Sequence, residues 1–422
     1  MNNLLKDVIN TATFKQSGIT FVGFVLNGFL GALFYIVVAR SLGPADFGLL
    51  TVTIVALTLI ADVADIGTNT GLIRFVSVNL SSNKQKALQF LKLSLEVKLV
   101  VWLICLVAIL LLAPIIALQI FHKTELTNPL RLVALGVGGA LLYSFATSSL
   151  QAFQKYVWWS AINISTNFLR LGMALILIVF SQLDLNNSLV SFISLPFLGF
   201  FITLLILPTR QIITAKNELD LSQEFFKYNI WVAVFTIIAA FSARLDIFLN
   251  AAWLSARDVG IYGAANQLVQ IVPQLVGALG VVAAPKFASF TDKKKMIVYL
   301  KKLQLLVTGL CLLGILVLPI VVYLIPIIYG PAYLKAITPF IYLFLAMLIF
   351  LFSVPVHNSV IFYYGRPDVF VWVSAGHLLI IGLLGYLLIP QLGILGTSLT
   401  VLVGTTFNFF APLIWLLIKI KK

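Results

Sequence analysis

The sequence has little charge for its length. Of its 422 residues, only 10% are Asp, Glu, Lys or Arg, whereas 61% are hydrophobic and the mean hydropathy is +1.08. A soluble domain carries about 25% charged residues, so this composition excludes a soluble globular protein. A helix that spans a bilayer needs about 20 apolar residues. Such runs recur along the whole sequence and leave no stretch for a separate soluble domain.

Cysteine and histidine are also scarce. Cys105 and Cys311 each lie inside an apolar run, which is typical of small hydrophobic side chains and not of a disulfide framework or a metal site. His122, His357 and His377 lack the spacing of metal ligands. The sequence contains no nucleotide-binding glycine-rich loop. We therefore expect no metal, no other cofactor and no direct use of ATP.

The apolar runs predict an all-α polytopic membrane protein with about twelve transmembrane helices. The first run is too long for the apolar core of a signal peptide and lacks a cleavage site, so we interpret it as a retained helix. The predicted spans are residues 17–39, 47–73, 99–121, 129–151, 158–180, 188–208, 229–253, 259–284, 303–328, 336–354, 369–389 and 393–418.

The positive charges predict the orientation of these helices. The chain has 28 Lys and Arg against 14 Asp and Glu, a net charge of +14 that in a soluble protein would suggest a nucleic-acid partner. With the N-terminus inside, twenty cations fall in cytoplasmic segments and their flanks. Five fall on the opposite side: Arg40, Lys123, Arg131, Arg257 and Lys335. This bias obeys the positive-inside rule. It predicts a multi-pass protein of the cytoplasmic membrane with both termini in the cytoplasm, membrane lipids as partners and no nucleic-acid partner.

A short motif indicates an internal duplication. The connection after the first span contains Asp46 and Gly48, and the connection after the seventh contains Asp258 and Gly260, 212 residues later. Six helices per copy would put both copies in the same orientation, a common transporter architecture with the binding site between the halves. We predict an N-terminal six-helix bundle (1–208), a cytoplasmic linker (209–228) and a C-terminal six-helix bundle (229–422) around a central cavity.

One polar stripe lies within the fifth predicted span. Ser160, Asn163, Asn167 and Arg170 recur at steps of three and four, which places them on one helical face. A guanidinium can bind phosphate oxygens through two N–H groups, so Asn167 and Arg170 are candidate substrate-binding residues. Polar contacts that hold helices together explain the stripe equally well.

Arg244 and Asp246 lie deep in the seventh span. Ionisable groups in the hydrocarbon region cost about 2.5–3.5 kcal/mol each on insertion scales, so each needs a partner, water or a function. Two residues apart on a helix, their side chains point away from each other. They are candidate substrate-binding residues, with interhelical pairing as the alternative.

The eighth span carries a row of polar side chains. Tyr262, Asn266, Gln270 and Gln274 recur at every fourth position and predict a continuous row of hydrogen-bonding groups. Amides suit sugar hydroxyls, which makes Asn266 and Gln270 candidate substrate-binding residues. Contacts between packed helices are the alternative.

Two carboxylates in the second span are candidates for ion coupling. Asp62 and Asp65 share a helical face, and two close carboxylates tend to hold one proton between them. Coupling to protons or sodium ions would suit this pair, and pairing with Arg170 or Arg244 would explain it equally well. We expect Lys98, at the start of the third span, to extend to the membrane surface.

Both halves of the sequence resemble one family of transporters. Arg40-Ser41-Leu42-Gly43-Pro44, Phe47-Gly48 and Asp65-x-Gly67 with Arg74 are similar to the opening of Wzx-type polysaccharide flippases. Arg244-x-Asp246 and Val259-Gly260-x-Tyr262-x-x-Ala265 are similar to the seventh and eighth helices of that family. It belongs to the multidrug/oligosaccharidyl-lipid/polysaccharide exporter superfamily. The resemblance implies two six-helix bundles around a cavity that opens alternately to each side. It also implies a lipid-linked oligosaccharide on undecaprenyl diphosphate as substrate, for O-antigen or another surface polysaccharide.

Other functions predict other features. A drug/cation antiporter of the same superfamily should have mainly acidic groups at membrane depth, and Arg170 and Arg244 count against it. A lipid II flippase or a teichoic acid exporter stays open. A polytopic oligosaccharide polymerase or ligase usually has a large external loop, whereas the external connections predicted here have about seven residues at most. A scaffold would have no water-accessible cavity. We expect a transporter and not an enzyme.

Overall fold

The computed structural model describes residues 12–80, 82–216 and 219–421. Within these ranges every secondary-structure element is a helix and no strand occurs, so the predicted all-α fold is confirmed. Eleven helical stretches in the described chain are long and apolar enough to cross a membrane, so this is a multi-pass membrane protein. The N-terminal residues that we predict to be cytoplasmic lie outside the described ranges.

The first of these stretches contains two of the predicted spans. Helix α2 (Ala12–Ala64) is interrupted at Gly43, where φ is 76° and ψ is 172°. A glycine tolerates this left-handed φ, and Pro44 beside it lacks the N–H that a continuous helix would use. The interruption falls where the sequence predicts the first external connection.

The described chain packs as two compact units. Unit 1 contains residues 12–38 and 53–240, and unit 2 contains residues 39–52 and 241–421. This division differs from the predicted domains 1–208 and 229–422 because the connection at 39–52 packs with unit 2. The assignment of the two predicted domains to a duplicated bundle stays a prediction.

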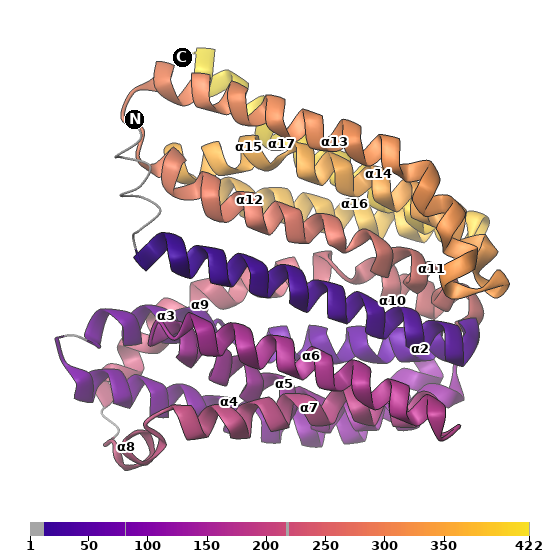
Figure 1. Ribbon diagram of the computed structural model, residues 1–422, viewed down its shortest axis with the longest axis horizontal. Coiled ribbons are helices and arrows are strands. Elements are labelled where there is room, and N and C mark those ends of the chain that lie inside the picture. Colours follow the sequence, from indigo (N-terminus) through magenta and orange to yellow (C-terminus); the bar gives the residue numbers. More distant parts are fainter. Residues whose placement is uncertain (1–11, 81, 217–218, 422) are drawn as a thin grey trace. The chain divides into compact units, whose positions relative to one another are not determined.

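Unit 1 contains most of the N-terminal helices, and α4 to α7 run side by side within it (Figure 1). Helix α3 packs against α4 and α5. Besides residues of α2, its helices are α3 (Thr68–Asn79), α4 (Lys84–Ile115), α5 (Thr127–Ala152), α6 (Tyr156–Val179), α7 (Leu185–Ile206), α8 (Thr209–Thr214) and most of α9 (Leu219–Ser242).

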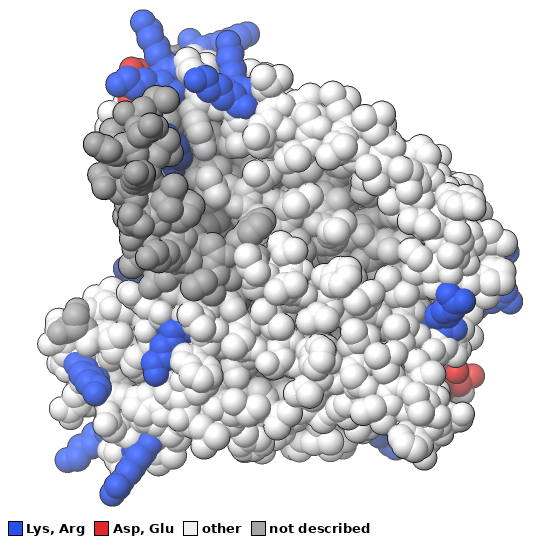
Figure 2. All heavy atoms as spheres, in the orientation of Figure 1, with Lys and Arg blue, Asp and Glu red and all other residues white. Residues whose placement is uncertain are grey.

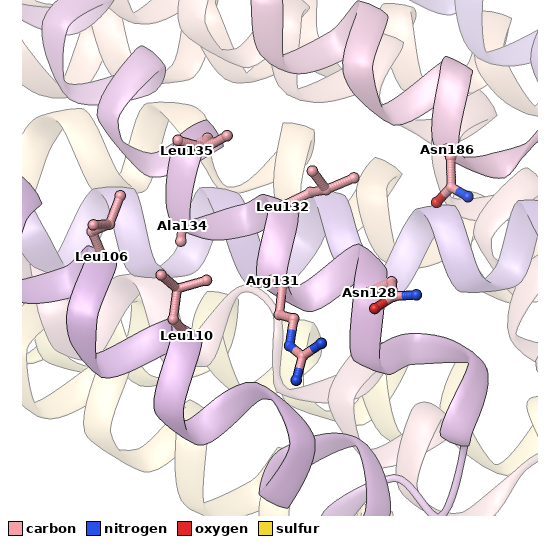
Figure 3. Close-up of a pocket in the computed structure, with 8 residues that line it drawn as sticks. All are labelled: Leu106, Leu110, Asn128, Arg131, Leu132, Ala134, Leu135 and Asn186. Carbon is pink, nitrogen blue, oxygen red and sulfur yellow. The ribbon is translucent and has the colours of Figure 1, made fainter.

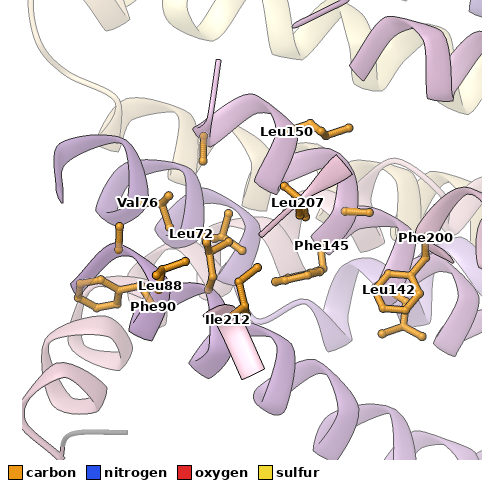
Figure 4. Packing of buried hydrophobic residues seen from close by; sticks show 14 of the residues in the cluster. Leu72, Val76, Leu88, Phe90, Leu142, Phe145, Leu150, Phe200, Leu207 and Ile212 are labelled. Carbon is orange, nitrogen blue, oxygen red and sulfur yellow. The ribbon is translucent and has the colours of Figure 1, made fainter. Parts of the chain in front are cut away.

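The hydrophobic core of unit 1 joins α3, α4, α5 and the segment after α7. Figure 4 shows Leu72 and Val76 of α3 near Leu88 and Phe90 of α4. In a membrane, lipid tails are as apolar as these side chains, so close van der Waals packing holds the helices together.

The predicted linker 209–228 is largely helical. It contains α8 and the first turns of α9. The Lys92 Nζ donates to the Ala215 carbonyl oxygen at 2.8 Å, and Lys86 Nζ forms a 3.1 Å ion pair with Glu224. These contacts attach both parts of the segment to α4 within unit 1.

Unit 2 is also a helical bundle. Helix α17 packs against α14 and α16, and α13 packs against α14. The helices of this unit are α10 (Leu245–Trp253), α11 (Ala256–Val269), α12 (Ile271–Ala288), α13 (Lys293–Tyr329), α14 (Ile337–Phe352), α15 (Val354–Asn358), α16 (Asp368–Leu392) and α17 (Ile394–Lys421).

Two predicted spans are discontinuous, which corrects the continuous helices expected at 47–73 and 229–253. The second span breaks between α2 and α3, where Ile66 and Gly67 have φ values of 50° and 71°. The seventh breaks before α10, where Arg244 has a φ of −130°. The eighth passes from α11 to α12 at Gln270, which keeps helical angles, so Ala256–Ala288 forms one apolar stretch long enough to cross a membrane. Broken helices at membrane depth expose backbone groups that ions and substrates can use.

Charged side chains on the face drawn in Figure 2 lie away from its centre. On the face shown in Figure 2, Lys and Arg gather at helix ends, and the broad surface between the ends is uncharged. This distribution is the one that a hydrocarbon layer requires of lipid-facing helices.

Candidate functional site

Arg170 of α6 is held by side chains of its own helix and of α7. Its Nη1 donates to the Asn167 Oδ1 at 2.7 Å. Its guanidinium carbon lies 4.1 Å from the ring centroid of Phe192 and 5.9 Å from that of Phe34. The cation therefore sits against an aromatic face, where the ring quadrupole attracts it.

The rest of the predicted polar stripe also points into unit 1. The amide nitrogen of Asn167 donates to the Asn27 Oδ1 of α2 at 2.5 Å, and the Tyr143 hydroxyl of α5 donates to the Asn163 Oδ1 at 3.1 Å. Ser160 is buried against Gly23. The predicted common face of these residues is confirmed, and their role in substrate binding stays a prediction.

Arg170 has no counter-ion among the described residues. No carboxylate of the described chain lies within 4.0 Å of its guanidinium, and its buried Nε has no hydrogen-bond partner there. A buried charge is costly unless it is paired. This arginine is therefore suited to bind an anion.

Arg244 and Asp246 lie at the start of α10 in unit 2. Arg244 is half-buried and directly precedes the helix, while Asp246 is buried in its first turn. The Tyr262 hydroxyl donates to the Asp246 Oδ2 at 2.5 Å. A carboxylate in a first helical turn is also favoured by the helix dipole.

The predicted continuous row of the eighth span stays a prediction. Gln270, between α11 and α12, keeps helical backbone angles, with φ −62° and ψ −13°. Tyr262 is fully buried in its bond to Asp246, Asn266 is half-buried, and Gln270 and Gln274 are exposed. The structure thus brings Asp246 together with Tyr262.

Asp65 forms an ion pair that the sequence did not predict. Lys98 of α4 is fully buried and its Nζ donates to the Asp65 Oδ1, so the expected extension of Lys98 to the membrane surface is wrong. Helix α4 begins at Lys84, far earlier than the predicted span at 99, and this places Lys98 within the bundle. Its position in the apolar stretch after Leu93 was the available signal. Asp62, one turn before Asp65, is half-buried.

A comparison with protein-family models shows to which family the chain belongs. Residues 14–291 match the model of a family described as polysaccharide biosynthesis protein, which is well over half of the chain. The chain belongs to the polysaccharide biosynthesis protein family. No curated protein sequence matches it.

Solved structures share the fold of this polysaccharide biosynthesis protein. An inward-facing multidrug resistance transporter of the MATE family, in the MOP superfamily, is 12% identical with a TM-score of 0.75, over 93% of this chain and 94% of that chain. The lipid II flippase MurJ in an inward closed conformation is 13% identical with a TM-score of 0.77, over 96% of this chain and 87% of that chain. At these identities the likeness shows the fold alone. It confirms the predicted transporter-type fold.

This family member also has a pocket in unit 1 that the sequence did not predict (Figure 3). Its volume is about 470 Å³, and leucines of α4 and α5 form most of its wall. Arg131, Asn128 and Asn186 supply its polar groups. None of the predicted substrate-binding residues lines it. Among the described residues, no group of three or more His, Cys, Asp or Glu side chains could hold a metal ion.

Proposed function

We propose that this protein flips undecaprenyl-diphosphate-linked oligosaccharides across the cytoplasmic membrane by alternating access, for the synthesis of a surface polysaccharide such as O-antigen. The observation that carries the proposal is the half-buried Arg170, whose buried Nε has no hydrogen-bond partner and whose guanidinium has no carboxylate partner in the described chain. Membership of the polysaccharide biosynthesis protein family supports a substrate from that process. The shared fold of a lipid II flippase supports a lipid-linked one.

The diphosphate and the sugar of this substrate each match polar side chains of unit 1. A diphosphate esterified at both ends carries two negative charges and several acceptor oxygens. A guanidinium offers N–H donors in a planar fork that can bind those oxygens. Within the described part of the chain, Arg170 makes one hydrogen bond, which its Nη1 donates to Asn167. The amides of Asn27, Asn163 and Asn167 next to it can exchange hydrogen bonds with sugar hydroxyls.

In the proposed cycle, the headgroup enters while the protein is open to the cytoplasm. Arg170 binds the diphosphate, and Arg244 stays a predicted substrate-binding residue. The lipid tail stays in the bilayer, and a change between two conformations releases the headgroup outside. No covalent step is needed, so the protein acts as a transporter and not as an enzyme.

The buried charges favour this proposal over a drug/cation antiporter of the same superfamily. An antiporter for cations needs carboxylates that can accept the cation. Asp65 is already paired with Lys98, and Asp246 accepts a hydrogen bond from Tyr262. Arg170, which has no carboxylate partner among the described residues, is instead a cation.

The test is translocation of a fluorescent undecaprenyl-diphosphate oligosaccharide in proteoliposomes. We expect Arg170→Ala and Arg170→Lys to slow flipping roughly 10- to 100-fold, since charge-assisted hydrogen bonds contribute about 1.5–3 kcal/mol each. Arg257→Ala is the matched control, because Arg257 is an exposed arginine at the start of α11. Equal rates for the Arg170 and Arg257 variants, or no flipping by wild type with any sugar headgroup, would contradict the proposal. Drug efflux or sugar polymerisation would then be measured.

A further inference from the structure

A buried polar cluster lies at the break between α2 and α3 in unit 1. Asp65 directly follows α2, and its two carboxylate oxygens accept several hydrogen bonds. Oδ1 accepts from Lys98 Nζ and from the Thr68 hydroxyl at 3.0 Å, and Oδ2 accepts from the Asn69 backbone N–H at 3.2 Å. The carboxylate therefore takes the place of a cap at the start of α3, which has no other side-chain cap.

Lys98 is bound less completely than its partner. The side chain of Lys98 is 0% exposed, and its ammonium donates to Asp65 and to the Ser144 hydroxyl at 3.1 Å. An ammonium has three donors, so one finds no acceptor in the described chain. The carboxylate of the pair is thus well supplied with hydrogen bonds, whereas the ammonium keeps one unused donor.

Several buried polar atoms of α3, α4 and α9 have no partner in the described chain. The buried hydroxyl of Ser94, one helical turn before Lys98, has no hydrogen-bond partner among the described residues, and neither does the Asn69 Oδ1. Asn229 of α9 is 1% exposed, and both polar atoms of its amide are unpartnered in the described chain. That amide packs against Gly71 of α3. Incompletely satisfied buried networks are rare in native proteins and call for an explanation.

The other ionisable groups nearest to the pair on the surrounding helices have partners of their own. Arg74 of α3 lies 4.5 Å from the ring centroid of Tyr228 of α9, and Glu96 of α4 forms a 3.8 Å ion pair with the lysine one turn before it. Tyr143 of α5 donates to an asparagine of α6. Asp62, half-buried on α2, is another carboxylate close to the pair along the chain, and it also has an interaction partner.

We infer that Asp65 and Lys98 form a proton-exchange site, in which the Lys98 ammonium occupies the position that a coupling sodium ion would take. As a coupling site, this inference rests on the proposed transport function. Sodium binds carboxylate and hydroxyl oxygens, and the Asp65 Oδ1 and the Ser144 hydroxyl oxygen both lie within hydrogen-bonding distance of the Lys98 ammonium. Because a built-in cation already neutralises Asp65, sodium is excluded. Proton transfer from Lys98 Nζ to Asp65 Oδ1 makes both groups neutral. When the pair takes up or releases a proton, the ion pair that connects α4 to the start of α3 is broken.

A sodium-binding test needs no transport substrate. Thermal unfolding of purified protein is measured in sodium and in choline chloride at equal ionic strength. We expect wild type to show no sodium-dependent shift and Lys98→Ala to gain one. Lys98→Ala/Asp65→Asn should lose the gain, and Arg366→Ala, which breaks an exposed ion pair with Asp368, should behave as wild type. Sodium stabilisation of wild type that disappears in Asp65→Asn, or no gain in a folded Lys98→Ala, would overturn the inference.

Proton binding is measured separately by infrared difference spectroscopy. Acidification should produce a protonated-carboxyl band in wild type that Asp65→Asn lacks and Asp368→Asn retains. If Lys98→Ala does not fold, the Asp65→Asn/Lys98→Met variant, which removes both charges, replaces it and should lose the band. If the band is unchanged in Asp65→Asn and in Asp65→Asn/Lys98→Met, Asp65 is not the group that binds the proton, and the inference is overturned.

A transport measurement separates this inference from the proposed function. In proteoliposomes, a pH gradient should accelerate flipping by wild type, a sodium gradient should not, and Asp65→Asn should flip without responding to pH. Flipping that responds to sodium and not to pH would overturn the proton site and leave the flippase intact. No flipping of any lipid-linked sugar, with the sodium and infrared results as expected, would instead contradict the proposed function alone.

Discussion

Gly48 and Gly260 pack backbone against backbone in unit 2. A Cβ added at Gly48 would overlap the Ala256 carbonyl and the backbone of Gly260, and a Cβ added at Gly260 would overlap the Pro44 carbonyl. These glycines are the matched positions of the predicted duplication, so the two copies of the motif contact each other. Only glycine permits so close an approach of two helices.

A methyl group at this contact should destabilise the protein. We expect Gly48→Ala and Gly260→Ala each to cost about 1–3 kcal/mol, since neither backbone can move away without displacing a helix. Thermal unfolding in detergent measures the effect. Gly277→Ala in α12, where no atom lies within 4 Å of the added Cβ, is the control and should be neutral or slightly stabilising. Equal unfolding temperatures for the three variants would show that the contact is not tight.

The buried ion pair should give a strongly non-additive mutant cycle. Asp65→Asn and Lys98→Met each leave one uncompensated charge inside unit 1, at a cost of about 3–5 kcal/mol. The double variant removes both charges and should unfold at a temperature closer to wild type than either single variant. Additive losses in the cycle would mean that the two side chains do not interact.

Supplying Arg170 with a counter-ion should separate stability from function. In Asn167→Asp, the new carboxylate replaces the Oδ1 that lies 2.7 Å from the guanidinium. We expect the unfolding temperature to rise, because a buried cation gains a partner. Flipping should fall about tenfold or more, because the diphosphate must then compete with that partner.

Asn163→Asp is the comparison for this prediction. It adds the same charge one turn earlier, where the side chain binds Tyr143. A rise in stability without loss of flipping in Asn167→Asp would assign Arg170 a purely structural role.

The proposed orientation predicts which loops an impermeant reagent can reach. With Cys105 and Cys311 replaced by alanine, a single cysteine at Lys335 or Arg257 should react with a membrane-impermeant maleimide in intact cells. A cysteine at Lys216 or Lys294 should react only after the membrane is opened, because the positive-inside rule places these residues in the cytoplasm. All four of these side chains are exposed. The reverse pattern would invert the proposed orientation.

Local features of this protein were determined by the sequence itself. Hydropathy alone identifies the membrane helices, because hydrocarbon tolerates few charges in any arrangement. The common face of Asn163, Asn167 and Arg170 follows from helical periodicity, which requires no knowledge of neighbouring helices. The interruption at Gly43 and Pro44 is likewise a property of those two residues.

Tertiary structure decided the partners and the breaks. Lys98 forms an ion pair with Asp65, 33 residues earlier, and does not extend to the membrane surface. Its partner depends on which helix lies beside α4, and the sequence does not show this. Tyr262 donates to Asp246, 16 residues earlier, a partner that the period of the eighth span does not reveal. Sequence periodicity assumes a straight helix with unspecified neighbours. A buried charge selects its partner from whatever the packed bundle brings within hydrogen-bonding distance.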